Sequence, residues 1–92
     1  MRKLRWSTKA AEDFEQIRKR IEADNFTAGR RIVETIYDAV VSLKDFPYRG
    51  RPGTYEGSRE LVLTPLPYIV VYRVSETHVE VSRIWHGAQR RH

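Results

Sequence analysis

Cationic and aromatic side chains alternate within one stretch of this 92-residue chain, where they could contact phosphates and stack on bases. Arg49, Arg51 and Arg59 bracket Tyr48 and Tyr55 in a segment rich in glycine and proline. Arginine binds phosphate oxygens through its guanidinium group, and tyrosine rings stack on unpaired bases. The same pattern also fits a solvated loop whose arginines stay in water while its tyrosines pack on the core. The residue types therefore predict a candidate nucleic-acid or target-binding loop and leave this structural alternative open.

A histidine near the C-terminus is the second candidate for chemistry. His86 follows a strand-like alternation and precedes a basic tail, so it could act as general acid or base in RNA cleavage. It could equally cap the edge of a sheet by hydrogen bonding to a loop. Strict alternation predicts which side chains share a face: Arg83 with Val79, Val81 and Trp85, and His86 with Glu80, Ser82 and Ile84.

The sequence carries no strong enzyme fingerprint. It has no phosphate-binding glycine loop, dinucleotide-binding motif, zinc-protease motif or nucleophile elbow. Its three histidines, His78, His86 and His92, lack carboxylates at metal-ligand spacing. Because cysteine is absent, disulfides, thiol nucleophiles and thiolate metal sites are excluded. We therefore expect neither a metal nor an organic cofactor.

Size and charge limit the remaining classes of protein. A chain of 92 residues predicts a single domain spanning residues 1–92. Its formal charge of +5 indicates an anionic partner, which includes nucleic acid, a ribosome or an acidic protein. No apolar run approaches the roughly 20 residues of a membrane helix, and the basic N-terminus leads into a charged amphipathic stretch. We expect a cytoplasmic protein that does not contact a membrane.

The elements that must position these residues follow from periodicity. Residues 3–6 predict a first strand, and Ser7 then caps a helix whose apolar stripe is Ala10, Phe14, Ile17 and Ile21. Asn25 or Thr27 can cap a second helix that ends before Pro47. The apolar stripe of that second helix consists of Ala28, Ile32, Ile36, Val40 and Leu43, widened by Val33 and Tyr37.

The second half of the chain predicts a loop and three strands. Three glycines and two prolines within residues 47–57 argue against regular structure there. Strands are predicted over residues 59–63, 68–74 and 79–85, joined by turns short enough for antiparallel hairpins. The apolar run 69–72 indicates a central strand covered on both faces. The predicted fold is therefore α+β: an N-terminal αα-hairpin packed on a small, mostly antiparallel sheet, in the order β-α-α-β-β-β.

Several short motifs in this order resemble the RelE/ParE superfamily, the toxins of bacterial type II toxin–antitoxin modules. They run from about Leu4 to Gln89: Leu-Arg-Trp-Ser at 4–7, Ala-x-x-Asp-Phe-x-x-Ile at 10–17, Phe-Pro-Tyr-Arg-Gly-Arg-Pro-Gly at 46–53, Ser-Arg-Glu-Leu-Val at 58–62, Pro-Tyr-Ile-Val-Val-Tyr-Arg-Val at 67–74 and Val-Ser-Arg-Ile-Trp-His-Gly-Ala-Gln at 81–89. The resemblance implies the fold derived above. It also implies a cognate antitoxin as partner, whose partly acidic tail suits a basic toxin.

The superfamily contains two mechanisms, and the resemblance implies different residues for each. RelE-like members cut mRNA on the ribosome; here His86 would be the general acid or base, with Arg59 and Arg83 stabilising the pentacovalent phosphate. ParE-like members inhibit DNA gyrase and need no catalytic residue. The residues that would contact RNA or the target are Arg49, Arg51 and Tyr55 of the loop and Gln89, Arg90 and Arg91 of the tail.

One position favours the gyrase inhibitor slightly. Many RelE-like members carry an arginine in the central strand where this chain has Ile69, and isoleucine cannot stabilise charge on a scissile phosphate. His86 does not discriminate, because ParE-like members often share the Arg-x-x-His segment. A ribosome-dependent mRNA endonuclease is the alternative, and a non-toxic RNA- or protein-binding module is the second alternative.

Overall fold

The computed structural model describes residues 2–87, and it confirms the predicted α+β fold. Two helices and five strands follow one another along the chain, with one short 3₁₀ helix, η1, between them. Their bounds are β1 Lys3–Trp6, α1 Thr8–Asp24, α2 Phe26–Val41, η1 Ser42–Lys44, β2 Arg51–Pro52, β3 Arg59–Val62, β4 Tyr68–Val74 and β5 His78–His86. Within residues 2–87, no helix is both long enough and apolar enough to cross a membrane.

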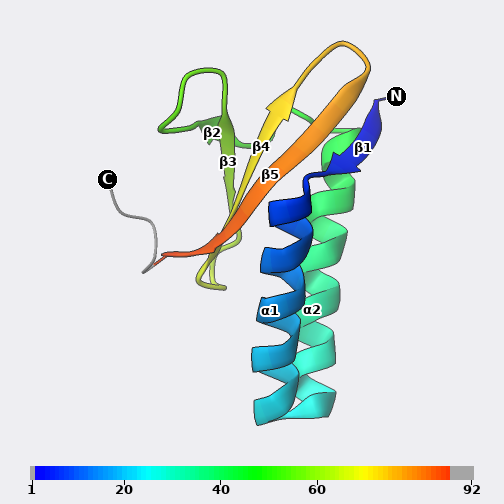
Figure 1. Cartoon of the computed structure of the whole chain (residues 1–92), viewed down its shortest axis with the longest axis vertical. Helices are drawn as coiled ribbons and strands as arrows, with labels where there is room; N and C mark the ends of the chain where they lie inside the picture. Colours follow the sequence, from blue (N-terminus) through cyan, green and yellow to red (C-terminus); the bar gives the residue numbers. More distant parts are fainter. Residues whose placement is uncertain (1, 88–92) are drawn as a thin grey trace.

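The five strands form one sheet in the order β1-β5-β4-β3-β2. β1 pairs with β5 in parallel, and all other neighbouring strands are antiparallel. The two helices lie side by side as an antiparallel hairpin, and their far ends extend past the sheet (Figure 1). The sheet therefore has one face that the helices cover and a second face that carries no helix.

Local capping chemistry sets where the helices begin and end. The Ser7 hydroxyl accepts the Ala10 N–H at 3.0 Å at the start of α1, as the sequence predicts. Asn25 closes α1 and opens α2, because its side-chain oxygen accepts the Ala28 N–H at 2.9 Å. Gly29 then lets the helices approach closely, since a Cβ at this position would lie only 2.9 Å from the Ile21 carbonyl oxygen.

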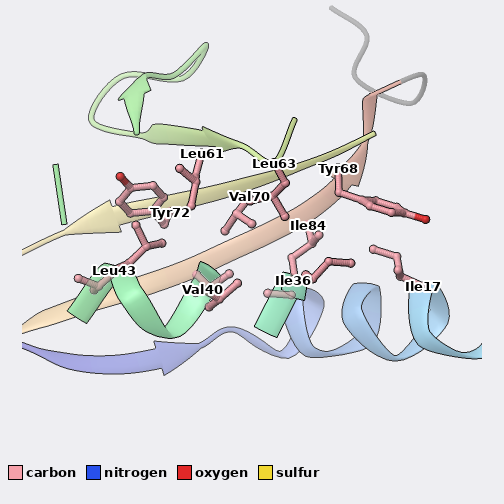
Figure 2. Close-up of a cluster of buried hydrophobic side chains, with 13 residues drawn as sticks. Ile17, Ile36, Val40, Leu43, Leu61, Leu63, Tyr68, Val70, Tyr72 and Ile84 are labelled. Carbon is pink, nitrogen blue, oxygen red and sulfur yellow. The ribbon is translucent and has the colours of Figure 1, made fainter. Parts of the chain in front are cut away.

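The core lies between the helix hairpin and the covered face of the sheet (Figure 2). Ile36 and Val40 of α2 are fully buried against Val70 and Tyr72 of β4. On the opposite face of β4, Ile69 and its neighbour Val71 are also buried. The prediction of a central strand covered on both faces is therefore confirmed.

A β-bulge in β5 overturns the predicted alternation. Tyr72 pairs with Val81 but Val71 pairs with Arg83, so Ser82 is an extra residue in this strand. Val81 and Ile84 consequently both lie in the core, although strict alternation puts them on opposite faces. Arg83 does not share a face with Val81, because an inserted residue shifts the period-two pattern for everything after it.

The predicted irregular loop contains a short strand and a buried anchor. Arg51–Pro52 pairs with β3, which corrects the expectation that residues 47–57 hold no regular structure. The fully buried Tyr72 hydroxyl donates to the Pro47 carbonyl oxygen at 2.7 Å and accepts the Gly50 N–H at 2.8 Å. Gly50 is required here, since a Cβ would lie 2.6 Å from the Tyr72 hydroxyl. One side chain of β4 therefore fixes the path of the loop.

Replacement of Tyr72 by phenylalanine tests this anchor. The substitution leaves the Pro47 carbonyl and the Gly50 N–H buried without their partner, so the free energy of unfolding falls by about 1–3 kcal/mol. Urea denaturation measures the change. Tyr37→Phe is the matched control, because the Tyr37 side chain is 48% exposed and its loss stays within about 0.5 kcal/mol. Equal stability of the two variants would contradict the anchoring role.

Candidate functional site

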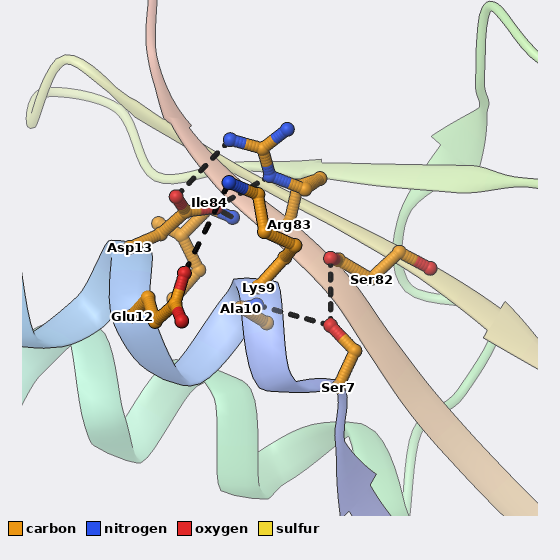
Figure 3. Close-up of polar contacts among 8 residues, drawn as sticks. All are labelled: Ser7, Lys9, Ala10, Glu12, Asp13, Ser82, Arg83 and Ile84. Carbon is orange, nitrogen blue, oxygen red and sulfur yellow. Dashed lines mark hydrogen bonds and ion pairs between the residues drawn. The ribbon is translucent and has the colours of Figure 1, made fainter.

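The site begins where α1 replaces β1 as the neighbour of β5. β1 pairs with β5 only as far as Val81, and the edge of β5 beyond that point faces α1. The Ser7 hydroxyl donates to the Ser82 carbonyl oxygen at 2.9 Å, and Asp13 accepts the Ile84 N–H at 3.0 Å (Figure 3). The first turns of α1 thus satisfy backbone groups that a strand would otherwise pair.

Asp13 also holds the side chain of Arg83. Its two carboxylate oxygens accept from Nε at 2.7 Å and from Nη2 at 3.1 Å, a bidentate geometry. These hydrogen bonds raise the pKa of Arg83 above its ordinary value. The guanidinium group also lies 5.7 Å from the centre of the Trp85 ring. The positive charge of Arg83 is therefore compensated, and its orientation is fixed toward α1.

A cleft of about 420 Å³ lies beside this contact, between α1 and the C-terminal part of β5. Tyr55 of the loop between β2 and β3 and Tyr68 of β4 both line it. The residues that line it are Lys9, Glu12, Asp13, Gln16, Ile17, Arg20, Tyr55, Tyr68, Arg83, Ile84, Trp85 and His86.

The cleft combines cations with aromatic rings. Lys9 has only a long contact of 3.9 Å with Glu12, and Arg20 makes no ion pair within residues 2–87. The Tyr55 ring meets the Trp85 ring edge to face at 6.3 Å. Such a lining suits a ligand that carries an anionic group next to a flat or apolar group. It has the composition of a binding site, whether or not chemistry takes place there.

His86 lies in the wall of this cleft. Its ring stands edge to face against the Tyr68 ring, with 5.5 Å between the centroids, and the two residues pair across β4 and β5. Tyr68 is buried and His86 is half-buried. The histidine is therefore held by a rigid neighbour in the wall of the cleft.

The structure brings together only part of the predicted catalytic set. His86 and Arg83 line the cleft, but Arg59 does not. Arg59 pairs with Tyr72 in the sheet, four residues beyond Tyr68, or about 13 Å along β4. There its guanidinium donates to the Gly50 carbonyl oxygen at 2.6 Å and lies over the Tyr48 ring.

The predicted binding residues are also divided. Tyr55 lines the cleft, whereas Arg49 donates to the Ser42 hydroxyl at 2.7 Å and Arg51 pairs with the buried Glu60 at 3.2 Å. The side chains of Arg49 and Arg51 are exposed. Gln89, Arg90 and Arg91 lie outside the described residues.

Sequence reasoning missed the contribution of α1 to this site. Lys9, Asp13, Gln16 and Arg20 repeat at helical spacing along one side of α1, but the pattern reads as a solvated face. Only the contact with the edge of β5 singles them out. Within residues 2–87, no group of three histidine, aspartate or glutamate side chains lies close enough to hold a metal ion.

Substitution of Asp13 tests whether this residue joins α1 to β5. Asp13→Ala removes the acceptor of Arg83 and of the Ile84 N–H, so the free energy of unfolding falls by about 1.5–3 kcal/mol. Asp13→Asn costs less, since its amide oxygen still accepts one of these hydrogen bonds. Denaturant unfolding and the amide NMR shift of Ile84 measure the effect.

Glu12→Ala is the control for this experiment. It changes the net charge equally but removes no hydrogen bond to β5, only the exposed 3.9 Å contact with Lys9 and a longer-range attraction to Arg83, so its cost stays within about 0.5 kcal/mol. If Glu12→Ala and Asp13→Ala destabilised the fold equally, net charge rather than the Asp13 contacts would be responsible.

Comparisons with known proteins agree with this architecture. The family model described as the ParE toxin of the type II toxin–antitoxin system parDE matches residues 4–91. The protein Y4kP of Sinorhizobium fredii is 38% identical over 89 residues, which cover 97% of this chain and 92% of that protein. Toxin RelE2 of Caulobacter vibrioides is 35% identical over 89 residues, 97% of this chain and 99% of that toxin.

A solved structure shares the fold across almost the whole chain. The structure of a chromosomal ParDE toxin–antitoxin system from P. aeruginosa contains a chain with a TM-score of 0.84 and 27% identity, covering 94% of this chain and 96% of that one. The sequence comparisons and the structural comparison therefore indicate the same family. The chain belongs to the ParE toxin family of type II toxin–antitoxin systems, within the RelE/ParE superfamily.

Proposed function

We propose that this toxin arrests growth by binding and inhibiting DNA gyrase, without catalysis of its own, and that a cognate antitoxin neutralises it. The observation that carries the proposal is the state of the two arginines that RNA cleavage would need. Arg83 is held by both oxygens of Asp13, and Arg59 is clamped to the loop carbonyls at a distance from His86. Neither guanidinium is poised beside the histidine to receive a phosphate.

The energetic argument follows from this arrangement. A donor that stabilises charge in a transition state contributes roughly 3–4 kcal/mol, and only when it is already aimed at the reacting atoms. Recruitment of Arg83 would break its bidentate bond and strand the carboxylate of Asp13, whose side chain is only 13% exposed. Recruitment of Arg59 would break its hydrogen bonds to the Tyr48 and Gly50 carbonyl oxygens. Binding alone requires neither change.

The central strand supports the same reading. Ile69 is buried beside Trp85, its partner across the sheet, at the position where many RNA-cleaving relatives carry an arginine. No cation is available from this part of β4. The family match to ParE toxins and the resemblance to a ParDE system favour the gyrase-directed branch. The excess of five positive charges suits an antitoxin with an acidic segment.

An mRNA endonuclease is the second candidate, and the cleft is the observation in its favour. His86 lies in the wall of the cleft with Lys9 and Arg20 on the facing helix, and Tyr55 with Trp85 offers aromatic surface for a base. In that reading His86 transfers the proton and the α1 cations, rather than Arg59, contact the phosphate. The toxin RelE2 from Caulobacter is among the relatives of this chain.

A single substitution separates the two functions. We expect purified wild-type chain and His86→Ala to inhibit gyrase-catalysed supercoiling equally, because the proposed inhibition involves no proton transfer. Both should arrest growth on induction in bacteria, with total RNA free of new 5′ ends. His78→Ala is the matched control, since that histidine lies at the other end of β5.

The same measurements can overturn the proposal. New cuts within translated codons that vanish in His86→Ala but persist in His78→Ala would establish the endonuclease. Unaffected supercoiling with intact RNA and normal growth would leave the non-toxic binding module. Loss of toxicity in both variants would indicate a defect of folding, which thermal denaturation of each purified variant detects.

A further inference from the structure

Five arginines that do not line the cleft gather at one end of the sheet, and none of them is held by a carboxylate. We call them the arginine surface: Arg2, Arg5, Arg49, Arg59 and Arg73. This end comprises the start of β1, the end of β4, the start of β5 and the loop at residues 46–50. In Figure 1 it lies beside the N-terminus, away from the far ends of the helices.

Each of these side chains is fixed by an acceptor other than a carboxylate. The acceptors are the Ser75 carbonyl for Arg2 at 2.6 Å, the His78 ring for Arg5 at 3.4 Å, the Ser42 hydroxyl for Arg49 at 2.7 Å, the Gly50 carbonyl for Arg59 at 2.6 Å and the Glu56 carbonyl for Arg73 at 2.7 Å. The guanidinium groups are thereby oriented while their charges stay uncompensated.

Two arginines of the helices, by contrast, are held by carboxylates. Arg18 pairs with Glu15 and with Glu22, and Arg30 pairs with Glu34, all at helical spacing. An arginine that is oriented by a neutral acceptor can bind an anion with little loss of affinity. An arginine that is paired with a carboxylate can bind an anion only after that carboxylate is displaced. Within residues 2–87, this end of the sheet therefore gathers five arginines that are oriented by neutral acceptors and have no carboxylate partner.

The arginine surface is continuous. Arg2 joins its two halves, since Nε donates to the Ser75 carbonyl and Nη2 reaches the Tyr48 hydroxyl at 3.4 Å. On one side, Arg59 lies over the Tyr48 ring at 5.3 Å. On the other side is a hollow of about 470 Å³ lined by Arg5, Gly57, Arg73, Val74, Ser75, His78 and Glu80.

Two of the arginines flank the hollow. Arg5 and Arg73 are both in register with Glu80 across three adjacent strands, so they flank it on the open face of the sheet. Glu80 makes no ion pair within 4 Å to either arginine. The negative charge of Glu80 therefore reduces the positive potential between Arg5 and Arg73 but does not cancel it.

The aromatic residues of this region favour contact with a nucleic-acid backbone over base stacking. Tyr48 is 61% exposed, but the guanidinium groups of Arg2 and Arg59 lie over its ring at 5.6 and 5.3 Å. Unpaired bases would have to displace them to stack there. A duplex, whose bases are already stacked, presents only its phosphates to such a surface.

We propose that the arginine surface binds the phosphate backbone of duplex DNA without reading its sequence. The binding is electrostatic, weak and salt-dependent, with a Kd on the order of 10⁻⁴–10⁻⁶ M at physiological salt. It goes beyond the proposed function and does not depend on it, because it rests on residues that do not line the cleft. A protein that acts on a DNA-bound enzyme would gain a second contact from it.

Fluorescence anisotropy with a labelled duplex of about 20 base pairs, titrated at several salt concentrations, tests the proposal directly. The double variant Arg5→Ala/Arg73→Ala should weaken binding on the order of tenfold and lower the salt slope by roughly 2. Lys19→Ala/Arg30→Ala on the helices removes the same charge and should leave the slope nearly unchanged. Glu80→Gln should tighten binding, which gives a gain of function that misfolding cannot imitate.

Four outcomes would overturn the proposal. These are an absence of duplex binding at low salt, equal losses in the two double variants, tighter binding of single-stranded DNA or of an RNA duplex, and equal competition by polyglutamate. The last two would redirect the surface to RNA or to an acidic protein. Failure of this test leaves the supercoiling assay unaffected, and failure of that assay leaves this one unaffected, so the two proposals are judged separately.

Discussion

The hydrogen bonds between Asp13 and β5 are the contact on which the arrangement of this toxin depends. A strand that loses its neighbour halfway exposes an edge, and an exposed edge invites pairing with other chains. Here β1 ends at Trp6, and α1 takes its place through Ser7 and Asp13. The bulge lies at this same point, where the Ser82 carbonyl oxygen accepts from the Ser7 hydroxyl. The helix is consequently placed where its polar side forms one wall of the cleft with His86.

A second constraint organises the other end of the sheet. The buried Tyr72 hydroxyl and the Arg59 guanidinium together hold residues 47–50 through their backbone groups. This explains why a loop rich in glycine and proline has a defined path, and why Arg59 is not available at the cleft. The two ends of one small sheet thereby acquire different characters: an aromatic cleft beside α1 and a surface of oriented arginines beside the N-terminus.

Much of the fold could be predicted from the sequence because it rests on local signals. The Ser7 and Asn25 caps, the apolar stripes of both helices and the doubly covered run at β4 all depend on residues near one another in the chain. The bulge and the two-residue strand β2 could not be predicted, since each depends on a partner strand. The same holds for the site. His86 could be predicted as a site residue from its residue type, whereas Asp13 is identified only by its contact with the Ile84 N–H.

The contacts of individual arginines show why the function of an arginine cannot be predicted from its residue type alone. The resemblance grouped Arg59 and Arg83 with His86 as the catalytic set of a ribonuclease, yet packing gives the three side chains separate surroundings. Arg83 is neutralised and secures a helix, and Arg59 secures a loop while keeping its charge. A cation is available to a ligand when its hydrogen-bond partner is neutral. A carboxylate partner compensates the positive charge, whereas a carbonyl or hydroxyl partner orients the side chain and leaves its charge in place. By that criterion the cations available beside His86 within residues 2–87 come from α1, where Arg20 makes no ion pair, and not from Arg59 or Arg83.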